Sequence, residues 1–215
     1  MTTHLTRPAV STPPTPRSGS ALFLREFVRS PLATASIIAS SAALARQMTE
    51  PLNRLDTPNP VVLELGPGTG AFTRAIAAAA PIGTRQLAVE LNPAMAGYLA
   101  EHHPDVDVIT GSAADLASLL GGRGISRVDM VVSGLPWQSF AGADGPHLIK
   151  NIADLLASNG SYTQFTYAWT RWTPPARRQH RLLRRAFDHV DVSATVWRNF
   201  PPAYVYTCTA PRAVQ

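Results

Sequence analysis

The chain has 215 residues, of which 45% are hydrophobic, and this is enough to bury the core of one large α/β domain. Its one cysteine, Cys208, excludes an intramolecular disulfide framework, and no Cys/His grouping has the spacing of a metal site. The net charge of +5 comes almost entirely from arginine, and six arginines lie between Arg171 and Arg185. This cluster favours an anionic partner such as nucleic acid, phospholipid or an acidic metabolite, although a solvated helix face explains it equally well.

Residues 1–20 are rich in Thr, Ser and Pro, and they contain no apolar stretch that could form the core of a signal peptide. We expect a disordered tail there. Because no run of eighteen apolar residues occurs in the chain, no transmembrane helix is expected either. The sequence therefore predicts a cytoplasmic protein whose membrane contact, if it has one, is peripheral at the inner surface.

Residues 21–58 are predicted to form helices that precede the main domain. The first helix carries Phe23 and Phe27 on one side and charged residues on the other. Ser30-Pro31 is typical of a helix start, so a second helix is predicted over residues 32–48. These helices would either dock on a membrane or form a lid over the domain.

In residues 59–212, short apolar strands alternate with helical patterns. Strands are predicted at residues 61–65, 86–90, 106–110, 128–133, 161–167, 190–197 and 204–209, and helices at 71–80, 93–101, 113–120, 146–157 and 175–187. This alternation predicts an α/β fold, in which a mostly parallel sheet has helices on both faces. The last two strands are too close for a crossover helix, so an antiparallel hairpin is expected at one edge.

The first predicted strand is followed by Gly66-Pro67-Gly68-Thr69-Gly70 and then by a helix. In open α/β sheets, ligands bind beyond the carboxyl ends of the strands, and this first unit is the usual nucleotide cradle. Glycines allow a tight turn and let the backbone approach a ligand closely. The G-x-G-x-G spacing is weak evidence by itself, because tight turns often contain glycine.

Two further strand ends strengthen this interpretation. Glu90 ends the second predicted strand, where its carboxylate can accept both hydroxyls of a ribose, although a helix cap is the simpler role of such an acid. Gly111-Ser112-Ala113 ends the third strand and can offer N–H groups and a hydroxyl to an adenine edge, although a helix start also needs such a turn. Together with the glycine loop, these residues favour a nucleoside-containing cofactor.

The ELGPGTG loop of residues 64–70, Glu90, the GSAADL stretch of residues 111–116 and the expected seven-strand order resemble class I, Rossmann-like methyltransferases. The resemblance implies S-adenosylmethionine as cofactor. It implies a binding site made by Glu64, Gly66, Gly68, Thr69, Gly70, Glu90, Leu91, Ser112, Ala113 and Ser133. Many members have Asp directly after the glycine that follows strand three, whereas this chain has Ser112 there and Asp115 three residues later. Either residue could therefore meet the adenine amino group.

Segments outside the common core resemble bacterial phospholipid N-methyltransferases, which methylate phosphatidylethanolamine or related amino-lipids. They are FLREFVRSP at residues 23–31, SGLP at 133–136, QFTY at 164–167 and VWRNFPPA at 196–203. The resemblance implies N-methylation of an amine-bearing lipid, with docking on an anionic membrane through the N-terminal helix and the arginine cluster.

Three residues are candidates for the acceptor site. A backbone carbonyl near Leu135, a tyrosine or water could take up the proton of the amine, and the sequence identifies no general base. Trp137 could hold a methylated ammonium through a cation–π contact. Tyr167 would lie on the same rim. For Trp137 the site role is favoured over packing of the loop against the sheet. For Tyr167 packing is the simpler explanation, because half-buried tyrosines are common in strands.

Two other functions are possible alternatives. One is a soluble methyltransferase that acts on small molecules of secondary metabolism. The other is an RNA-binding protein, because the motif after strand four also resembles the N-L-P-Y motif of ribosomal-RNA adenine dimethyltransferases. The chain lacks the Asn of that motif and has Trp137 in place of its Tyr, so a nucleic-acid substrate is not expected.

Overall fold

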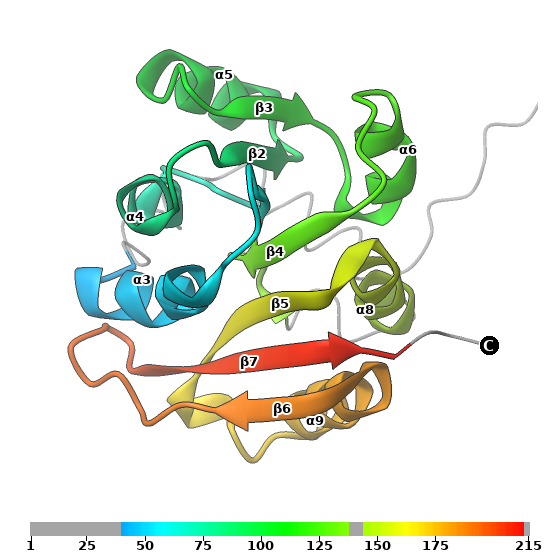
Figure 1. Ribbon diagram of the computed structural model, residues 1–215. Helices are drawn as coiled ribbons and strands as arrows, with labels where there is room; N and C mark the ends of the chain where they lie inside the picture. Colours follow the sequence, from blue (N-terminus) through cyan, green and yellow to red (C-terminus); the bar gives the residue numbers. More distant parts are fainter. Residues whose placement is uncertain (1–39, 138–143, 213–215) are drawn as a thin grey trace, which may run out of the picture.

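The computed structural model describes residues 40–137 and 144–212, and it forms a three-layer α/β domain (Figure 1). A seven-stranded sheet has the order β3-β2-β1-β4-β5-β7-β6. Its strands are β1 (Val61–Leu65), β2 (Arg85–Glu90), β3 (Asp107–Thr110), β4 (Val128–Ser133), β5 (Leu156–Tyr167), β6 (Phe187–Val192) and β7 (Ala203–Pro211). The first five strands pair in parallel, and β7 pairs antiparallel with β5 on one side and with β6 on the other. The predicted sheet and its antiparallel C-terminal hairpin are confirmed.

Helices cover both faces of this sheet, as Figure 1 shows. The α-helices are α3 (Ala42–Thr49), α4 (Ala71–Ala79), α5 (Pro93–His102), α6 (Leu116–Gly121), α8 (Asp144–Leu155) and α9 (Pro174–Ala186), and the 3-10 helices are η1 (Glu50–Arg54), η2 (Ala113–Asp115) and η3 (Ala168–Thr170). Helices α3, α4 and α5 lie on one face, and α6, α8 and α9 lie on the other.

Two hydrophobic clusters fill the space between the sheet and these layers. Leu63 and Leu65 of β1 point into the cluster that α6, α8 and α9 cover, whereas Val62 points into the cluster that α3 and α4 cover. Successive strand residues point to opposite faces, and here both faces are buried. This is why the strands are almost continuously apolar in the sequence.

Backbone hydrogen bonds join the loops that follow the central strands. The amides of Gly66, Gly111 and Gly134 each donate to a carbonyl at the end of a neighbouring strand, with N···O distances of 2.8 to 2.9 Å. The loops after β1, β3 and β4 therefore start at one edge of the sheet and in fixed positions. A ligand bound at this edge would meet all three loops.

Strand β5 begins five residues earlier than the predicted strand, and the predicted helix over residues 146–157 ends at Leu155. The sequence Asn159-Gly160 suggests a loop, but Gly160 lies within the strand, where the pairing register between β4 and β5 shifts. A Cβ at Gly160 would lie 2.9 Å from the Ala157 carbonyl oxygen. The glycine thus permits a bulge in the strand and does not end it.

The other end of the sheet also differs from the prediction. Strand β6 starts at Phe187 and ends at Val192, so Trp197 lies outside it, in the connection to β7. Beyond β6, a single bridge between Val196 and Ala203 continues the pairing. The alternation of apolar residues indicated the strand correctly but not its ends.

The predicted helix over residues 32–48 is wrong as one continuous helix. Ser41 has an extended backbone, and its hydroxyl oxygen accepts a hydrogen bond from the Leu44 amide at 3.1 Å, which makes it the N-cap of α3. The Ser41 amide donates to Asn199 Oδ1 at 2.9 Å, so the start of α3 is tied to the connection between β6 and β7. The predicted tail at residues 1–20 and the helix that contains Phe23 and Phe27 lie outside the described residues.

Candidate cofactor and acceptor site

The three glycines of the loop after β1 all have positive φ. The surroundings of Gly66 and Gly70 differ from those of Gly68. A Cβ at Gly66 would lie 2.7 Å from Leu135 Cδ2, and a Cβ at Gly70 would lie 2.8 Å from His103 Nε2. At Gly68 a Cβ would meet no protein atom within 4 Å. The backbone at Gly68 therefore faces open space, and a ligand can approach it closely.

Glu90 joins this loop to the start of α5. Its side chain is buried, and its Oε2 accepts a hydrogen bond from the Gly68 amide at 3.2 Å, while Oε1 accepts one from the Asn92 amide at 2.9 Å. Each carboxylate oxygen can accept a further hydrogen bond. The N-cap of α5 is Asn92, whose Oδ1 accepts from the Ala94 amide at 2.9 Å. Glu90 therefore holds the amide of the cap residue without being the cap, and it can still accept ribose hydroxyls.

Glu64 lies beneath the loop and not on its surface. It is fully buried, and its Oε2 accepts a hydrogen bond from the Thr73 hydroxyl at 2.7 Å. Its Oε1 has no partner among the residues that the structure describes. Burial, together with the nearby negative charge of Glu90, raises the pKa of Glu64 to about 8. The carboxyl is therefore mostly protonated at neutral pH and supports the loop as a neutral group.

The other residues that the sequence predicts to bind the cofactor differ in their exposure to solvent. Thr69 and Leu91 are exposed, and Ala113 lies at the buried start of η2. Ser112 Oγ accepts a hydrogen bond from the Ala114 amide at 3.1 Å, which is the helix-start role considered above. Ser133 is fully buried, and its Oγ accepts a hydrogen bond from the Leu135 amide at 3.4 Å.

The loop after β4 lies against the glycine loop. A Cβ at Gly134 would lie 2.6 Å from the Gly66 carbonyl oxygen, so only glycine fits there. The Leu135 carbonyl oxygen accepts a hydrogen bond from Gln164 Nε2 at 2.8 Å, and the Tyr162 hydroxyl donates to Gln164 Oε1 at 2.6 Å. Sequence reasoning assigned no role to Gln164. The signal that could have found it is an amide side chain inside an apolar strand.

Trp137 and Tyr167 do not meet on one rim. The Trp137 ring is 3% exposed, and its Nε1 donates to the Pro175 carbonyl oxygen at 3.3 Å within the cluster that α9 covers. Tyr167 packs edge-on against Phe165 in the cluster on the opposite face. The ring of Trp137 thus has no open face for an ammonium group, and the geometry favours packing over the predicted cation–π contact.

The hydroxyl of Tyr167 is a polar group without a partner among the described residues. Burial raises the pKa of Tyr167 to about 12, so the hydroxyl remains protonated at neutral pH. It can donate a hydrogen bond to a ligand, but it cannot serve as a phenolate base.

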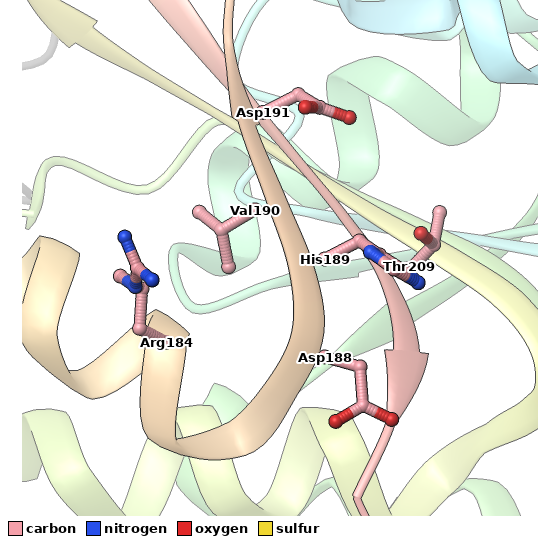
Figure 2. Close-up of a pocket in the computed structure, with 6 residues that line it drawn as sticks. All are labelled: Arg184, Asp188, His189, Val190, Asp191 and Thr209. Carbon is pink, nitrogen blue, oxygen red and sulfur yellow. The ribbon is translucent and has the colours of Figure 1, made fainter.

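A separate pocket lies at the amino end of β6, between that strand and α9 (Figure 2). It is lined by Arg184, Asp188, His189, Val190, Asp191 and Thr209. Asp188 also forms an exposed ion pair with Arg212 at 2.8 Å. Its lining shares no residue with the glycine loop, with Glu90 or with the loop after β4, so the pocket does not belong to the candidate site.

Comparisons with known proteins agree with this geometry. Residues 62–160 match the family described as "Methyltransferase domain". The chain is 35% identical over 191 residues to an ornithine lipid N-methyltransferase of Singulisphaera acidiphila, and the match covers 87% of this chain and 94% of that protein. The chain belongs to the class I S-adenosylmethionine-dependent methyltransferases. The fold and cofactor that the sequence predicts are thereby confirmed.

Solved structures share the fold of this methyltransferase. An O-methyltransferase from Bacillus cereus in complex with SAH has a TM-score of 0.62 at 15% identity, and the match covers 90% of this chain and 92% of that one. A TehB-like SAM-dependent methyltransferase from Corynebacterium glutamicum has a TM-score of 0.53 at 16% identity, with 89% and 97% covered.

The residues at the sheet edge suit S-adenosylmethionine. Gly68 presents a backbone with open space beside it, and Glu90 presents carboxylate oxygens that can accept ribose hydroxyls. The cofactor supplies the methyl group as an electrophile, so the methyltransferase itself mainly has to place the two reactants in line.

Replacing Gly68 by Ala should weaken cofactor binding. Gly124 is a matched control, because it also has positive φ and open space where a Cβ would be, but it lies in the turn before β4. Both replacements should cost about 1 kcal/mol of stability through backbone strain. Only Gly68→Ala should reduce the affinity for S-adenosylhomocysteine in calorimetric titration, by roughly tenfold. Equal affinities in the two variants would refute a close approach at Gly68.

Replacing Glu90 by Ala should lower the same affinity by about 100-fold, because charged acceptors for the ribose and for the Gly68 amide are lost. Glu90→Gln keeps one oxygen acceptor and should lower the affinity by about tenfold. Calorimetry measures both values, and denaturant unfolding checks that the variants fold. Unchanged affinity in Glu90→Ala would show that Glu90 does not bind the ribose.

Replacing Glu64 by Gln should make stability less dependent on pH. The folded-state pKa of about 8 lies above the usual value of 4.5, so the folded chain holds a proton that the unfolded chain releases as the pH rises between these values. The wild type should therefore lose about 2 kcal/mol of unfolding free energy between pH 5 and pH 7 through this group. Urea unfolding at both pH values measures the loss, and an equal loss in Glu64→Gln would contradict the assignment.

Proposed function

We propose that this methyltransferase methylates the amine nitrogen of an amino-lipid. The observation that carries the proposal is the 35% identity to an ornithine lipid N-methyltransferase, of which the match covers 94%. The segments that resemble phospholipid N-methyltransferases imply the same class of acceptor as this relative, namely a lipid with a free amine.

For the cofactor, we assign the contacts to the loop and to the strand ends. Gly66, Gly68, Thr69 and Gly70 would offer backbone groups, and Glu90 would accept the ribose hydroxyls. Around the adenine we place Leu91, Ser112 and Ala113. Glu64 and Ser133 are fully buried, so they would support the loops from beneath.

For the acceptor, we assign positioning roles to the loop after β4. Gln164 holds the Leu135 carbonyl oxygen, whose second lone pair could orient an N–H of the amine. The Tyr167 hydroxyl could contact the head group as a hydrogen-bond donor. Trp137 would fix the loop by packing. The amine would lose its proton to solvent and then gain the methyl group that the cofactor supplies.

An amino-lipid substrate requires contact with a membrane. In the part of the chain that the structure describes, no helix is both long and apolar enough to cross a bilayer. We therefore propose peripheral contact with an anionic inner leaflet. Exposed arginines of α9, among them Arg177, Arg178 and Arg181, suit this role because basic residues near an anionic surface attract it.

The test is to incubate the purified protein with S-adenosylmethionine labelled in its methyl group and with a cell lysate. We expect the label to enter the lipid fraction, on the amine of a head group. The Glu90→Ala variant, which should bind cofactor poorly, is the control for enzymatic transfer. Label in the aqueous fraction would favour the small-molecule alternative, and label in RNA would favour the nucleic-acid alternative.

A further inference from the structure

Five large aromatic side chains are exposed on the described domain. Tyr98 on α5 is 44% exposed, and the four that are 71% exposed or more come from two short segments. Trp169 and Trp172 lie between β5 and α9 and are 71% and 73% exposed, whereas Trp197 and Phe200 lie between β6 and β7 and are 77% and 85% exposed. We call these four residues the aromatic rim. Aromatic residues normally bury large areas, so four exposed ones in two adjoining segments indicate a surface for interaction.

The two segments of the aromatic rim are neighbours in the fold. The Ala168 amide donates to the Pro202 carbonyl oxygen at 2.8 Å, and Tyr167 pairs with Ala203 across β5 and β7. In Figure 1 the arrowheads of β5 and β6 point towards the side where the chain turns into β7. The aromatic rim therefore lies at the carboxyl ends of the parallel strands, at the same edge as the glycine loop.

Hydrogen bonds of Asn199 fix the connection that carries Trp197 and Phe200. Asn199, between them, is 2% exposed, its Nδ2 donates to the Pro201 carbonyl oxygen at 2.8 Å, and its Oδ1 accepts from the Ser41 amide at 2.9 Å. A buried polar residue with two such bonds fixes the backbone on either side of it. Trp197 and Phe200 are thus exposed on a segment whose backbone Asn199 fixes.

The segments that carry the aromatic rim are basic and contain no acidic residue. Residues 160–187 and 192–212 contain no Asp or Glu, and Arg171 and Arg198 are both exposed beside the rim aromatics. The Arg171 guanidinium lies 5.7 Å from the centre of the Trp172 ring. Aromatic rings beside arginines match the boundary between acyl chains and anionic head groups, where rings insert and cations remain at the surface.

We propose that the aromatic rim docks this enzyme on an anionic phospholipid bilayer, with the rings in the interfacial layer and the arginines at the lipid phosphates. This inference rests on the proposed function, because it explains how a lipid amine reaches a site at the same edge of the sheet. The bilayer thereby lies next to Tyr167, the last residue of β5.

Vesicle binding by the full chain tests the docking. Two double variants, Trp169→Ser with Trp172→Ser and Trp197→Ser with Phe200→Ser, should each bind vesicles containing about 30% phosphatidylglycerol at least roughly tenfold more weakly. Ile82→Ser is the matched control, since Ile82 is 103% exposed but lies before β2, at the opposite edge. It should bind like the wild type, and vesicles of phosphatidylcholine alone should bind all variants weakly.

Fluorescence provides a second measurement on the unchanged protein. Three of the four tryptophans belong to the aromatic rim, and the fourth, Trp137, is buried. Anionic vesicles should therefore shift the emission to shorter wavelengths, and brominated lipids should quench it. If residues 21–39 or a second copy of the chain cover the rim instead, acrylamide will quench poorly without lipid and vesicles will cause no shift. Either result would overturn the proposal.

A third measurement separates failure of the docking from failure of the proposed function. The double variants should keep the wild-type affinity for S-adenosylhomocysteine and the wild-type activity on a short-chain, monomeric amino-lipid, and lose activity only on vesicles. If the wild type binds anionic vesicles through the aromatic rim but methylates no amino-lipid, docking stands and the proposed function fails. If it methylates vesicle lipids and the variants bind vesicles equally well, the function stands and the docking proposal fails.

Discussion

The close contact between the loops after β1 and β4 is the constraint on which the site depends. Side chains are excluded on both sides, since a Cβ at Gly134 would collide with the Gly66 carbonyl oxygen and a Cβ at Gly66 with Leu135. The glycine loop and the loop after β4 therefore form one packed unit. Displacing either loop would displace the other, and a methyl transfer that depends on alignment would lose rate.

The two buried carboxyl groups near this unit have different hydrogen-bond partners. Glu64 has one hydroxyl donor and no solvent, so burial keeps it protonated, whereas Glu90 has two backbone amides as donors. Desolvation destabilises the charged form of a carboxyl group, which is why burial of Glu64 has this effect. Glu64 is thus a neutral support, whereas the oxygens of Glu90 are the ones to which we assign the ribose hydroxyls.

The order of the elements could be predicted because strands buried on both faces give apolar runs that alternate with amphipathic helices. Local signals misled at two positions, since Gly160 belongs to a bulge and Ser41 starts a helix. The positions of the glycine loop and Glu90 could be predicted because each directly follows or ends a short apolar strand, β1 and β2 respectively. The link from Gln164 to Leu135 and the burial of Trp137 could not, because both depend on contacts between segments far apart in the sequence.

The place of β7 between β5 and β6 has a consequence for synthesis on the ribosome. Among the strands of the sheet, β7 is made last, yet β5 and β6 do not pair with each other and both need it as a partner. Until β7 has been released, β5 has an open edge that can pair wrongly with other chains. The connections before β6 and before β7 consequently reach their final positions only after β7 has been made and paired, so a shorter nascent chain does not yet present the aromatic rim.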